Sequence, residues 1–154
     1  MIYAIVAIDA DFGIGKNGTI PWKSSADFAH FKQTTMGSAI MMGKTTWCSI
    51  GNKPLPGRHN IVVSTTLVSD LCEIVHPSQV SMVIDRYVGK DDLYLLGGKQ
   101  LLDEYSNHCS EIIITRIPGS HGCDVFLSSD IIRGYVMYKT AQLTDGLIVE
   151  YYRK

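Results

Sequence analysis

Short apolar runs rich in β-branched residues recur along the chain and predict its strands. Several of them lack polar alternation, which is typical of strands covered on both faces of a sheet. The runs lie at 2–8, 38–42, 60–64, 72–76, 93–96, 111–117, 135–143 and 147–152. Helical candidates lie between them near 25–35, 44–50, 78–87 and 99–107. This alternation of strands and helices predicts an α/β fold built on a largely parallel sheet.

The last two strand runs are joined by Thr144-Asp145-Gly146, a typical hairpin turn. We therefore expect the final strand to run antiparallel to its neighbour. The chain has 154 residues and contains no repeat, low-complexity segment or linker. This length predicts a single domain, residues 1–154, that is large enough to enclose a hydrophobic core.

Composition and charge narrow the function classes. Apolar residues make up 45% and charged residues 19% of the chain, as in an ordinary globular protein. The net charge of −1 provides no general attraction to nucleic acid or acidic membranes, so we expect neither as a partner. No apolar run approaches the length of a membrane span. The N-terminal run lacks a basic start and a cleavage site, so we interpret it as a strand of a cytoplasmic protein.

The four cysteines, at positions 48, 72, 109 and 123, show no closely spaced pair. This pattern favours free thiols in a reducing compartment. Histidines lie near two of the cysteines, at 108 and 121, but the spacings match no common zinc motif. We therefore expect no metal site.

The stretch GSAIMMGKTT (37–46) ends like the phosphate loop of nucleotide hydrolases. Its two glycines, however, are separated by five residues instead of the four that this loop needs, and those five resemble a buried strand. Lys44, Thr45 and Thr46 then fall at the start of the next element. The free N–H groups of a helix there would favour an anion. The alternative is a plain turn with an exposed lysine.

A second turn of this kind follows the run at 93–96, where Gly97-Gly98 precedes a helical pattern. Paired glycines let the backbone approach a ligand closely. Because ligands bind beyond the carboxyl ends of parallel strands, two such turns could hold the two ends of a dinucleotide. Alternatively, the glycines only permit tight packing. The common GxGxxG fingerprint is absent.

Asp27 is the most informative acidic residue. Ser24 or Ser25 can cap a helix over 25–35, which places the carboxylate in its first turn. On this helix Asp27 shares a face of about 120° with apolar and hydroxyl side chains, at roughly 100° per residue. Those neighbours are Phe28, Phe31, Thr34 and Thr35, whereas His30, Lys32 and Gln33 point elsewhere. A buried carboxylate needs a partner, which in a pocket could be a ligand. A first-turn acid that complements the helix dipole is the alternative.

Two further segments suggest a binding site. DFGIGKNGTIPW (11–22) contains three glycines and ends in an apolar anchor, so it could form a lid or merely a long surface loop. PLPGRHN (54–60) presents Arg58 just before a strand. An arginine there could bind a carboxylate through two parallel hydrogen bonds, or it could be solvated.

Together these segments resemble dihydrofolate reductase along nearly the whole chain. GIGKNGTIPW is similar to the active-site loop of that family, and Ala26-Asp27-Phe28 with Phe31-Lys32 to its substrate helix. MGKTTWCSIG and LLGGKQLL resemble its two cofactor turns, and LPGRHNIVVS its folate-carboxylate arginine and following strand. Thr115 matches a threonine that the family pairs with its catalytic acid. Cys123-Asp124-Val125-Phe126 resembles an acidic loop segment late in the family's sequence, which we call the late loop. No single motif is decisive, but their shared order is specific.

The resemblance implies a three-layer α/β fold: a mostly parallel, eight-stranded mixed sheet flanked by about four helices, with an antiparallel C-terminal strand. It implies a monomer that uses NADPH to reduce 7,8-dihydrofolate to tetrahydrofolate. Hydride would pass to pterin C6 and a proton to N5. The product would supply one-carbon metabolism and thymidylate synthesis, which would make the protein an antifolate target.

The resemblance also implies roles for individual residues. The catalytic set is Asp27, Trp22 and Thr115. The substrate-binding set is Ile5, Ala7, Phe28, Phe31, Ile50, Leu55 and Arg58. The cofactor-binding set is Ala7, Ile14, Gly15, Ile20, Gly43, Lys44, Thr45, Thr46, Ser64, Thr65, Leu96, Gly97, Gly98, Lys99, Gln100 and Leu101. Asp27 would bind the amidine-like edge of the pterin, and Arg58 the glutamate tail.

The chain departs from the family pattern near the second cofactor turn and in the late loop. Leu102 replaces an aromatic residue, Lys99 a glycine, Gln100 an arginine and Val125 a threonine. Two other functions therefore stay open: a reductase of another pterin or of a flavin precursor, and a non-catalytic nucleotide-binding module. A purely structural domain would leave Asp27 on an apolar face unexplained.

Overall fold

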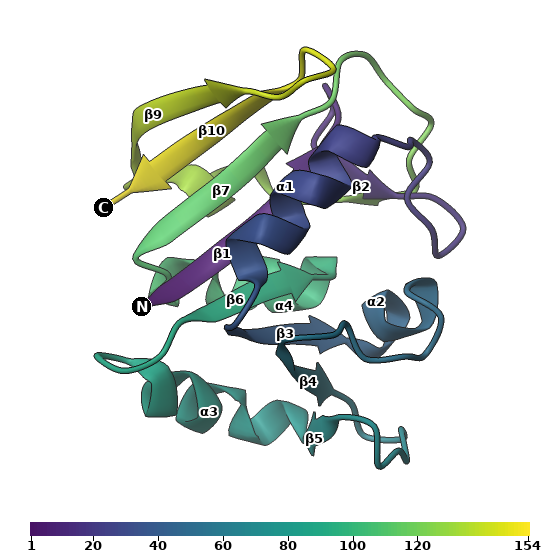
Figure 1. The fold of residues 1–154 in the computed structure, drawn as a ribbon, viewed down its shortest axis with the longest axis vertical. Coiled ribbons are helices and arrows are strands. Elements are labelled where there is room, and N and C mark those ends of the chain that lie inside the picture. The colour runs from purple at the N-terminus through teal and green to yellow at the C-terminus, as the bar shows by residue number, and fades with distance from the viewer.

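An eight-stranded sheet forms the middle of the computed structural model, which describes residues 1–154. The strands are β1 (Ile2–Ile8), β3 (Ala39–Gly43), β4 (His59–Val63), β5 (Glu73–Val75), β6 (Leu93–Gly97), β7 (Glu111–Arg116), β9 (Val136–Gln142) and β10 (Ile148–Arg153). Their order across the sheet is β5-β4-β3-β6-β1-β7-β10-β9, which Figure 1 shows from bottom to top. Neighbours from β5 to β7 are parallel, whereas β10 is antiparallel to both β7 and β9. The predicted mixed sheet is confirmed.

The strands consist of continuous apolar runs because the sheet is covered on both faces. Ile40, Met41 and Met42, which are consecutive in β3, are all fully buried, so neither face of this strand meets solvent. Each predicted run begins and ends within one residue of an observed strand. The predicted hairpin is also present, because the Leu143 N–H donates to the Leu147 carbonyl at 2.8 Å across the turn before β10. The edge strand β9 differs from the others, since only Ala141 in it is partly covered.

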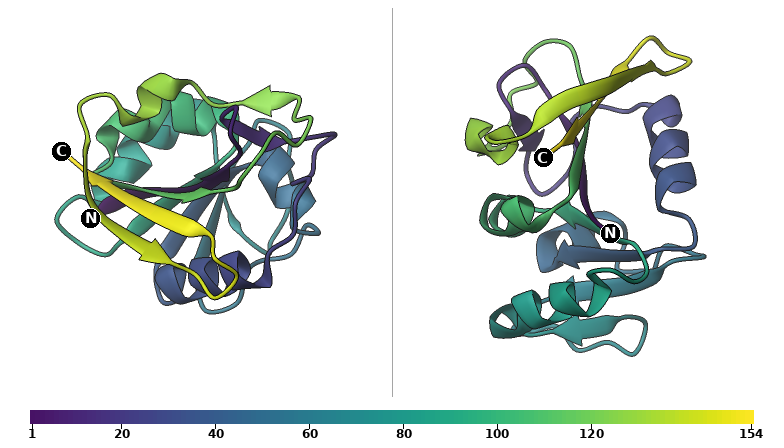
Figure 2. Two further views of the ribbon diagram at one scale, coloured as in Figure 1. Left: turned by 90° about the horizontal axis from the view of Figure 1, so that it is seen from above. Right: turned by 90° about the vertical axis from the view of Figure 1, so that its left-hand side faces the viewer.

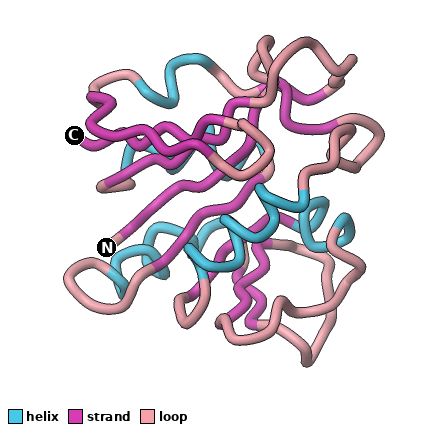
Figure 3. Tube along the Cα trace, turned by 45° about the horizontal axis from the view of Figure 1, so that its top comes forward, coloured by secondary structure: helices cyan, strands magenta, loops and turns pink.

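Four α-helices flank the sheet, as predicted: α1 (Ser25–Thr35), α2 (Lys44–Ser49), α3 (Val80–Tyr87) and α4 (Lys99–Tyr105). Short 3₁₀ turns span Pro77–Gln79, Ser106–His108 and Ser129–Ile132, so the helix expected from 78 becomes α-helical only at Val80. α1 lies over one face of the sheet, and α3 and α4 over the other (Figure 2). Figure 3 shows the strands running between the helical segments. None of the helices combines the length and apolar character of a membrane span.

Each face of the sheet has its own apolar cluster. The larger cluster includes Val83 and Ile84 of α3 with Leu101 and Leu102 of α4. The smaller one is built around Trp47 of α2, and Phe31 of α1 packs against it. The helices on the two faces and the sheet between them form the three-layer architecture that the sequence predicts.

Two short strands were not predicted. β2 (Gly13–Gly15) pairs antiparallel with β8 (Val125–Phe126) and forms a separate two-stranded sheet. A tight turn closed by Lys16 and Thr19 follows β2. The segment 11–22, expected to be a loop, therefore contains a strand that is tied to the late loop near 125. Strands of two or three residues are too short to produce a periodic pattern, so the sequence could not reveal them.

The burial pattern predicts how two matched valine substitutions differ. Val62→Ala removes two methyl groups from a fully buried position, and we expect a loss of about 2–3 kcal/mol in the free energy of unfolding. Val68→Ala makes the same chemical change at a side chain that is 93% exposed, and we expect a change within about 0.5 kcal/mol. Urea denaturation of both variants measures the difference. Equal losses would contradict the placement of β4 in the core.

Candidate active site

A cleft of about 1030 Å³ lies where the parallel strands end. Its walls come from the ends of β1, β3, β4, β6 and β7, from the face of α1, and from the turns that lead into α2 and α4. Every residue predicted to bind substrate or cofactor lines this cleft, as do Asp27 and Thr115. Trp22 is not among the lining residues. Its side chain is partly buried and packs edge-on against His121, with ring centroids 5.3 Å apart.

Asp27 is held in the cleft by the way its helix begins. Ser24 is the N-cap of α1, and its hydroxyl oxygen accepts a hydrogen bond from the Asp27 N–H at 3.0 Å. At the end of β7, the buried Thr115 hydroxyl donates to Asp27 Oδ1 at 2.8 Å. Burial raises the pKa of Asp27, and the Thr115 hydrogen bond offsets this only in part. A carboxylate with a raised pKa in a cleft is typical of an acid–base site.

The predicted apolar face of α1 needs correction. Thr35 is fully buried and Phe31 partly so, as expected, but the Phe28 side chain is 58% exposed because it projects into the open cleft. His30 was expected to point away from this face. It instead lines the cleft and packs edge-on against Tyr151 of β10. The prediction for His30 was wrong because α1 faces both the sheet and the cleft, so side chains on more than one side of the helix are covered.

Arg58 is positioned by a buried amide that the sequence analysis missed. Asn60 accepts a hydrogen bond from the Leu55 N–H at 2.9 Å and donates to the carbonyls of Leu55 and Arg58. These bonds fix the turn that carries Arg58. The guanidinium then donates to Thr35 Oγ1 at 3.2 Å and lies 5.8 Å from the Phe31 ring centroid. A planar cation held at the edge of a cleft suits a carboxylate ligand.

The two glycine turns meet because β3 and β6 are neighbours in the sheet. A Cβ atom added to Gly43 would lie 3.7 Å from the Gly98 nitrogen, so the turns are nearly in contact. Gly97 has a φ of 140°, which side chains rarely allow, and its peptide bond to Gly98 is cis. The prediction that two such turns act on one ligand therefore has the required geometry.

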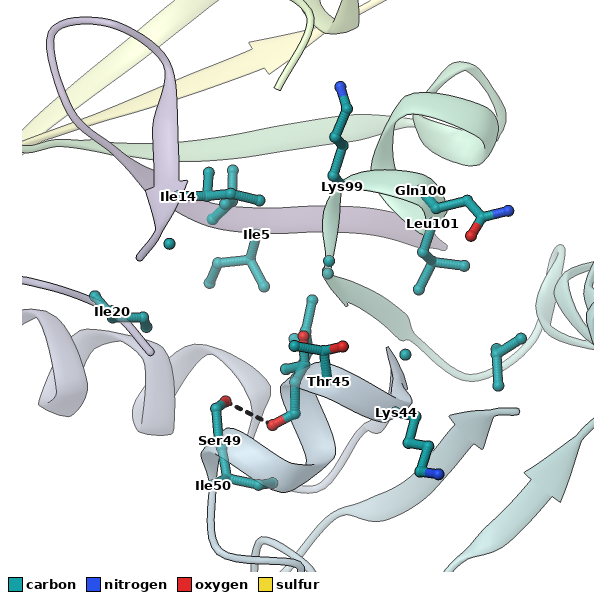
Figure 4. Close-up of a pocket in the computed structure, with 18 of the residues that line it drawn as sticks. Ile5, Ile14, Ile20, Lys44, Thr45, Ser49, Ile50, Lys99, Gln100 and Leu101 are labelled. Atoms are coloured by element: carbon teal, nitrogen blue, oxygen red, sulfur yellow. Dashed lines mark hydrogen bonds between the residues drawn. The ribbon is translucent and has the colours of Figure 1, made fainter. Parts of the chain in front are cut away.

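Hydroxyl groups and one lysine gather beside the first glycine turn. The Lys44 ammonium donates to Thr66 Oγ1 at 3.0 Å, and Ser64 Oγ accepts from the Thr66 N–H at 3.1 Å. Figure 4 shows Lys44 and Thr45 leaving the start of α2 in different directions, both at the cleft. A cation surrounded by hydroxyl groups suits a phosphate group. Thr66 was not predicted, because a threonine in a polar loop has no distinctive pattern.

The structure shows what two residues that depart from the family pattern, Lys99 and Leu102, contact. The Lys99 ammonium donates to Asp103 at 2.7 Å and to the Phe126 carbonyl at 2.9 Å. It points away from Lys44 in Figure 4, although its stem lines the cleft. Leu102 is buried in the larger apolar cluster and is not a lining residue. Lys99 therefore links α4 to the late loop, and Leu102 contributes to the core.

Asp9 is a second buried carboxylate, only 1% exposed, that the sequence analysis did not single out. Its Oδ1 accepts from the backbone N–H groups of Asp11 and Gly13, at 2.9 and 2.8 Å. Its Oδ2 accepts from the His121 N–H at 3.1 Å and from the Cys123 thiol at 3.4 Å. Asp9 thus ties the segment before β2 to the loop before β8. Burial alone would raise the pKa of Asp9, but these hydrogen bonds hold it below its usual range.

The fold and the cleft indicate the class of protein. A half-buried acid, two facing glycine turns and a cation among hydroxyl groups, all at the carboxyl ends of parallel strands, are typical of a nucleotide-dependent oxidoreductase. The family model for dihydrofolate reductase matches residues 1–144. The chain belongs to the dihydrofolate reductase family. It is an NADPH-dependent oxidoreductase.

Individual relatives agree with this assignment. The chain is 38% identical over 119 residues to the dihydrofolate reductase of Bacillus subtilis, covering 76% of this chain and 69% of that protein. It is 34% identical over 140 residues to the bifunctional dihydrofolate reductase-thymidylate synthase of Paramecium tetraurelia, covering 90% of this chain but 30% of that protein. A solved dihydrofolate reductase from Enterococcus faecalis, complexed with NADP(H) and RAB-propyl, has the same fold. Its TM-score is 0.89 at 23% identity, over 99% of this chain and 95% of that one.

The Asp9 network yields a pH-dependent stability prediction. A carboxyl whose folded pKa is depressed stabilises the fold above its unfolded pKa of about 3.9, and this stabilisation is lost as the pH falls through the folded pKa. We expect Asp9→Asn to lower the free energy of unfolding by roughly 1–2 kcal/mol at neutral pH, because the donors lose a charged acceptor. The difference from the wild type should shrink below a pH of about 3.9.

Asp11→Asn is the matched control, since Asp11 lies in the same segment but is exposed. Its free energy of unfolding should stay within about 0.5 kcal/mol of the wild type. Denaturant unfolding across the acidic range measures all three proteins. A constant deficit of Asp9→Asn at every pH would show that the charge on Asp9 is not what stabilises the two loops.

Proposed function

We propose that this chain catalyses the reduction of 7,8-dihydrofolate to 5,6,7,8-tetrahydrofolate in the cleft, with NADPH as the reductant. The observation that supports this most directly is Asp27, a half-buried carboxylate bonded to Thr115, in the same cleft as the paired glycine turns. A folate-like substrate carries an amidine edge for the acid and a carboxylate tail for Arg58. A nucleotide hydrolase would need neither of these groups.

The residues present fit NADPH. Its phosphate groups require cations and N–H or hydroxyl donors, and the first glycine turn provides Lys44 with Thr45, Ser64, Thr65 and Thr66 beside it. Gly97 and Gly98 would let the backbone approach the pyrophosphate closely. The remaining cofactor set follows the same wall of the cleft: Ala7, Ile14, Gly15, Ile20, Gly43, Thr46, Leu96, Lys99, Gln100 and Leu101. When bound, NADPH supplies the hydride that reduces pterin C6.

The chain's own residues orient the substrate for this transfer. Asp27 receives two parallel hydrogen bonds from the amidine edge of the pterin, while Thr115 keeps the carboxylate in place. Apolar side chains from β1, α1 and the 50–55 segment surround the rings and exclude water. They are Ile5, Ala7, Phe28, Phe31, Ile50 and Leu55. Asp27 shifts the protonation equilibrium of the ring, and a water admitted past the 11–22 segment delivers the proton to N5.

Trp22 is one of the three residues predicted to be catalytic, and that role stays a prediction. Its contact with His121 also anchors the 11–22 segment, so Trp22 positions this segment beside the cleft. Every residue that lines the cleft comes from one chain and one sheet, so we propose that this domain acts as a monomer. We place it in the cytoplasm, without nucleic acid or membrane as a partner.

Turnover of the purified protein tests the proposal directly. We expect NADPH absorbance to decline only when dihydrofolate is added, and methotrexate to abolish the decline. NADPH oxidation with a ribosylated pyrimidine, but not with dihydrofolate, would instead identify a flavin-precursor reductase. Binding of NADPH without turnover of either substrate would point to a non-catalytic nucleotide-binding module.

The role of Asp27 predicts a pH-dependent defect. Asp27→Asn removes the charge that binds the pterin, so hydride transfer at neutral pH should slow by about a hundredfold or more. The deficit should be smaller at low pH, where the substrate already carries the proton. Stopped-flow measurement of NADPH oxidation reports the hydride step. Asp85→Asn, on the exposed side of α3, is the control and should behave as the wild type does. An unchanged rate in Asp27→Asn would disprove the assignment.

The Lys44 cluster predicts cofactor selectivity. Lys44→Gln removes the cation nearest Thr66, and we expect the KM for NADPH to rise roughly tenfold while the KM for NADH stays the same. The reason is that only NADPH carries the additional 2′-phosphate. Lys53→Gln neutralises an exposed lysine that does not line the cleft and serves as the matched control. Equal changes for both cofactors would show that Lys44 does not contact the 2′-phosphate.

A further inference from the structure

His30 lies one turn after Asp27 on α1, and both side chains line the cleft. Its Nε2 is the single buried side-chain nitrogen or oxygen in the chain that has no hydrogen-bond partner within the protein. Residues three apart on a helix lie on the same side, with Cβ atoms about 5–6 Å apart. The imidazole and the carboxylate of Asp27 therefore lie on the same side of α1, and no hydrogen bond or ion pair joins them directly.

Packing alone does not explain an imidazole at this position. The ring meets Tyr151 of β10 edge-on, with centroids 6.5 Å apart and planes at 88°. A phenylalanine ring could make the same contact without burying an unpaired polar atom, which is costly. Almost all buried polar atoms in folded proteins have partners, so those that lack one require an explanation. The choice of histidine points to a role for its nitrogen or its charge.

The surroundings of His30 contain one nearby anion. On its own helix this is Asp27, whose other partner is Thr115 of β7. From the sheet it faces Tyr151, which has Lys139 of β9 over its ring at 4.7 Å and Tyr138 at its edge. The charge of Asp145, in the turn before β10, raises the pKa of Asp27. A positive imidazole would therefore find its nearest counter-charge in Asp27.

We propose that His30 is a positioning residue for Asp27, and that the two side chains form a coupled pair which takes up one shared proton when the cleft is acidified. At neutral pH the imidazole is neutral and the carboxylate is ionised. As the pH falls, the proton goes preferentially to His30, and the resulting positive charge keeps Asp27 anionic. The consequence for catalysis, that the pterin-binding form persists to lower pH, rests on the proposed function.

The directions in which the pKa values of the two groups are shifted agree with this geometry. Burial lowers the pKa of His30, and the charge of Asp27 raises it again in part. Burial raises the pKa of Asp27, and both the Thr115 hydrogen bond and the charge of His30 lower it in part. Burial thus draws the two pKa values toward each other, whereas the opposite charges of the two groups push them apart. Groups that interact in this way titrate as a pair and not as independent residues.

Nuclear magnetic resonance titration tests the pair without any need for turnover. The side-chain carboxyl carbon of Asp27 is followed in the wild type, in His30→Gln and in Gln33→His. We expect the Asp27 midpoint to move to higher pH in His30→Gln, because the stabilising positive charge is lost. Gln33→His adds an imidazole on the exposed side of the same helix and should leave the Asp27 midpoint in place.

The reciprocal titration follows the ring protons of His30 in Asp27→Asn. Because coupling is mutual, the His30 midpoint should move to lower pH by a shift matching that of Asp27. This second variant also decides the matter if His30→Gln does not fold. Unmoved midpoints in the variants that fold would overturn the inference and leave His30 as a packing residue.

A binding measurement connects the pair to the site. Trimethoprim is the probe, because its diaminopyrimidine ring presents the amidine-like edge that Asp27 would bind. At mildly acidic pH, His30→Gln should bind it about threefold to tenfold more weakly than the wild type, and at mildly alkaline pH equally well. Equal affinities at both pH values would overturn the claim that His30 keeps the carboxylate ionised for the ligand.

The two proposals can fail separately. If NADPH is oxidised with dihydrofolate but the Asp27 midpoint is the same with and without His30, only the inference about His30 fails. If the midpoints shift as expected while dihydrofolate is not reduced, the coupled pair stands and the proposed substrate is wrong.

Discussion

The cleft depends on one constraint, the parallel alignment of β4, β3, β6, β1 and β7. Parallel neighbours end at the same edge of the sheet, so segments far apart in the sequence are brought together there. Gly43 and Gly98 approach each other because their strands are adjacent, and Thr115 reaches Asp27 because β7 ends beside the start of α1. If any one of these strands were reversed, its turn would lie at the opposite edge and the cleft would lose a wall.

Asp9 and Asp27 show how one side chain serves two purposes. Burial disfavours the charge of both carboxylates, but four donors surround Asp9 whereas Thr115 alone donates to Asp27. The pKa of Asp9 is therefore held down, and that of Asp27 is raised. The fully bonded acid joins two loops, and the under-bonded acid faces the cleft with capacity left for a ligand.

The strands could be predicted because most are buried on both faces and consist of apolar runs, as β3 shows. The glycine turns, Asp27 and Arg58 could be proposed because each residue type has a restricted chemistry at its place in the chain. Other features depend on contacts between residues that are far apart in the sequence. Asp9 meets residues 121 and 123, Lys99 meets residue 126, and His30 turns toward β10, which follows it by more than a hundred residues. No local pattern encodes such contacts, so only the fold reveals them.

The position of β10 has a consequence for the order in which the chain assembles. β10 lies between β7 and β9, so β9 contacts the sheet only through a strand that is synthesised after it. On the ribosome, residues 136–142 therefore have no strand partner until residues 148–153 have emerged. Thr115, which holds Asp27, lies on β7 beside Val149 of β10. A nascent chain can thus form the glycine turns early, but the strand behind Thr115 and Asp27 is in place only after β10 has emerged.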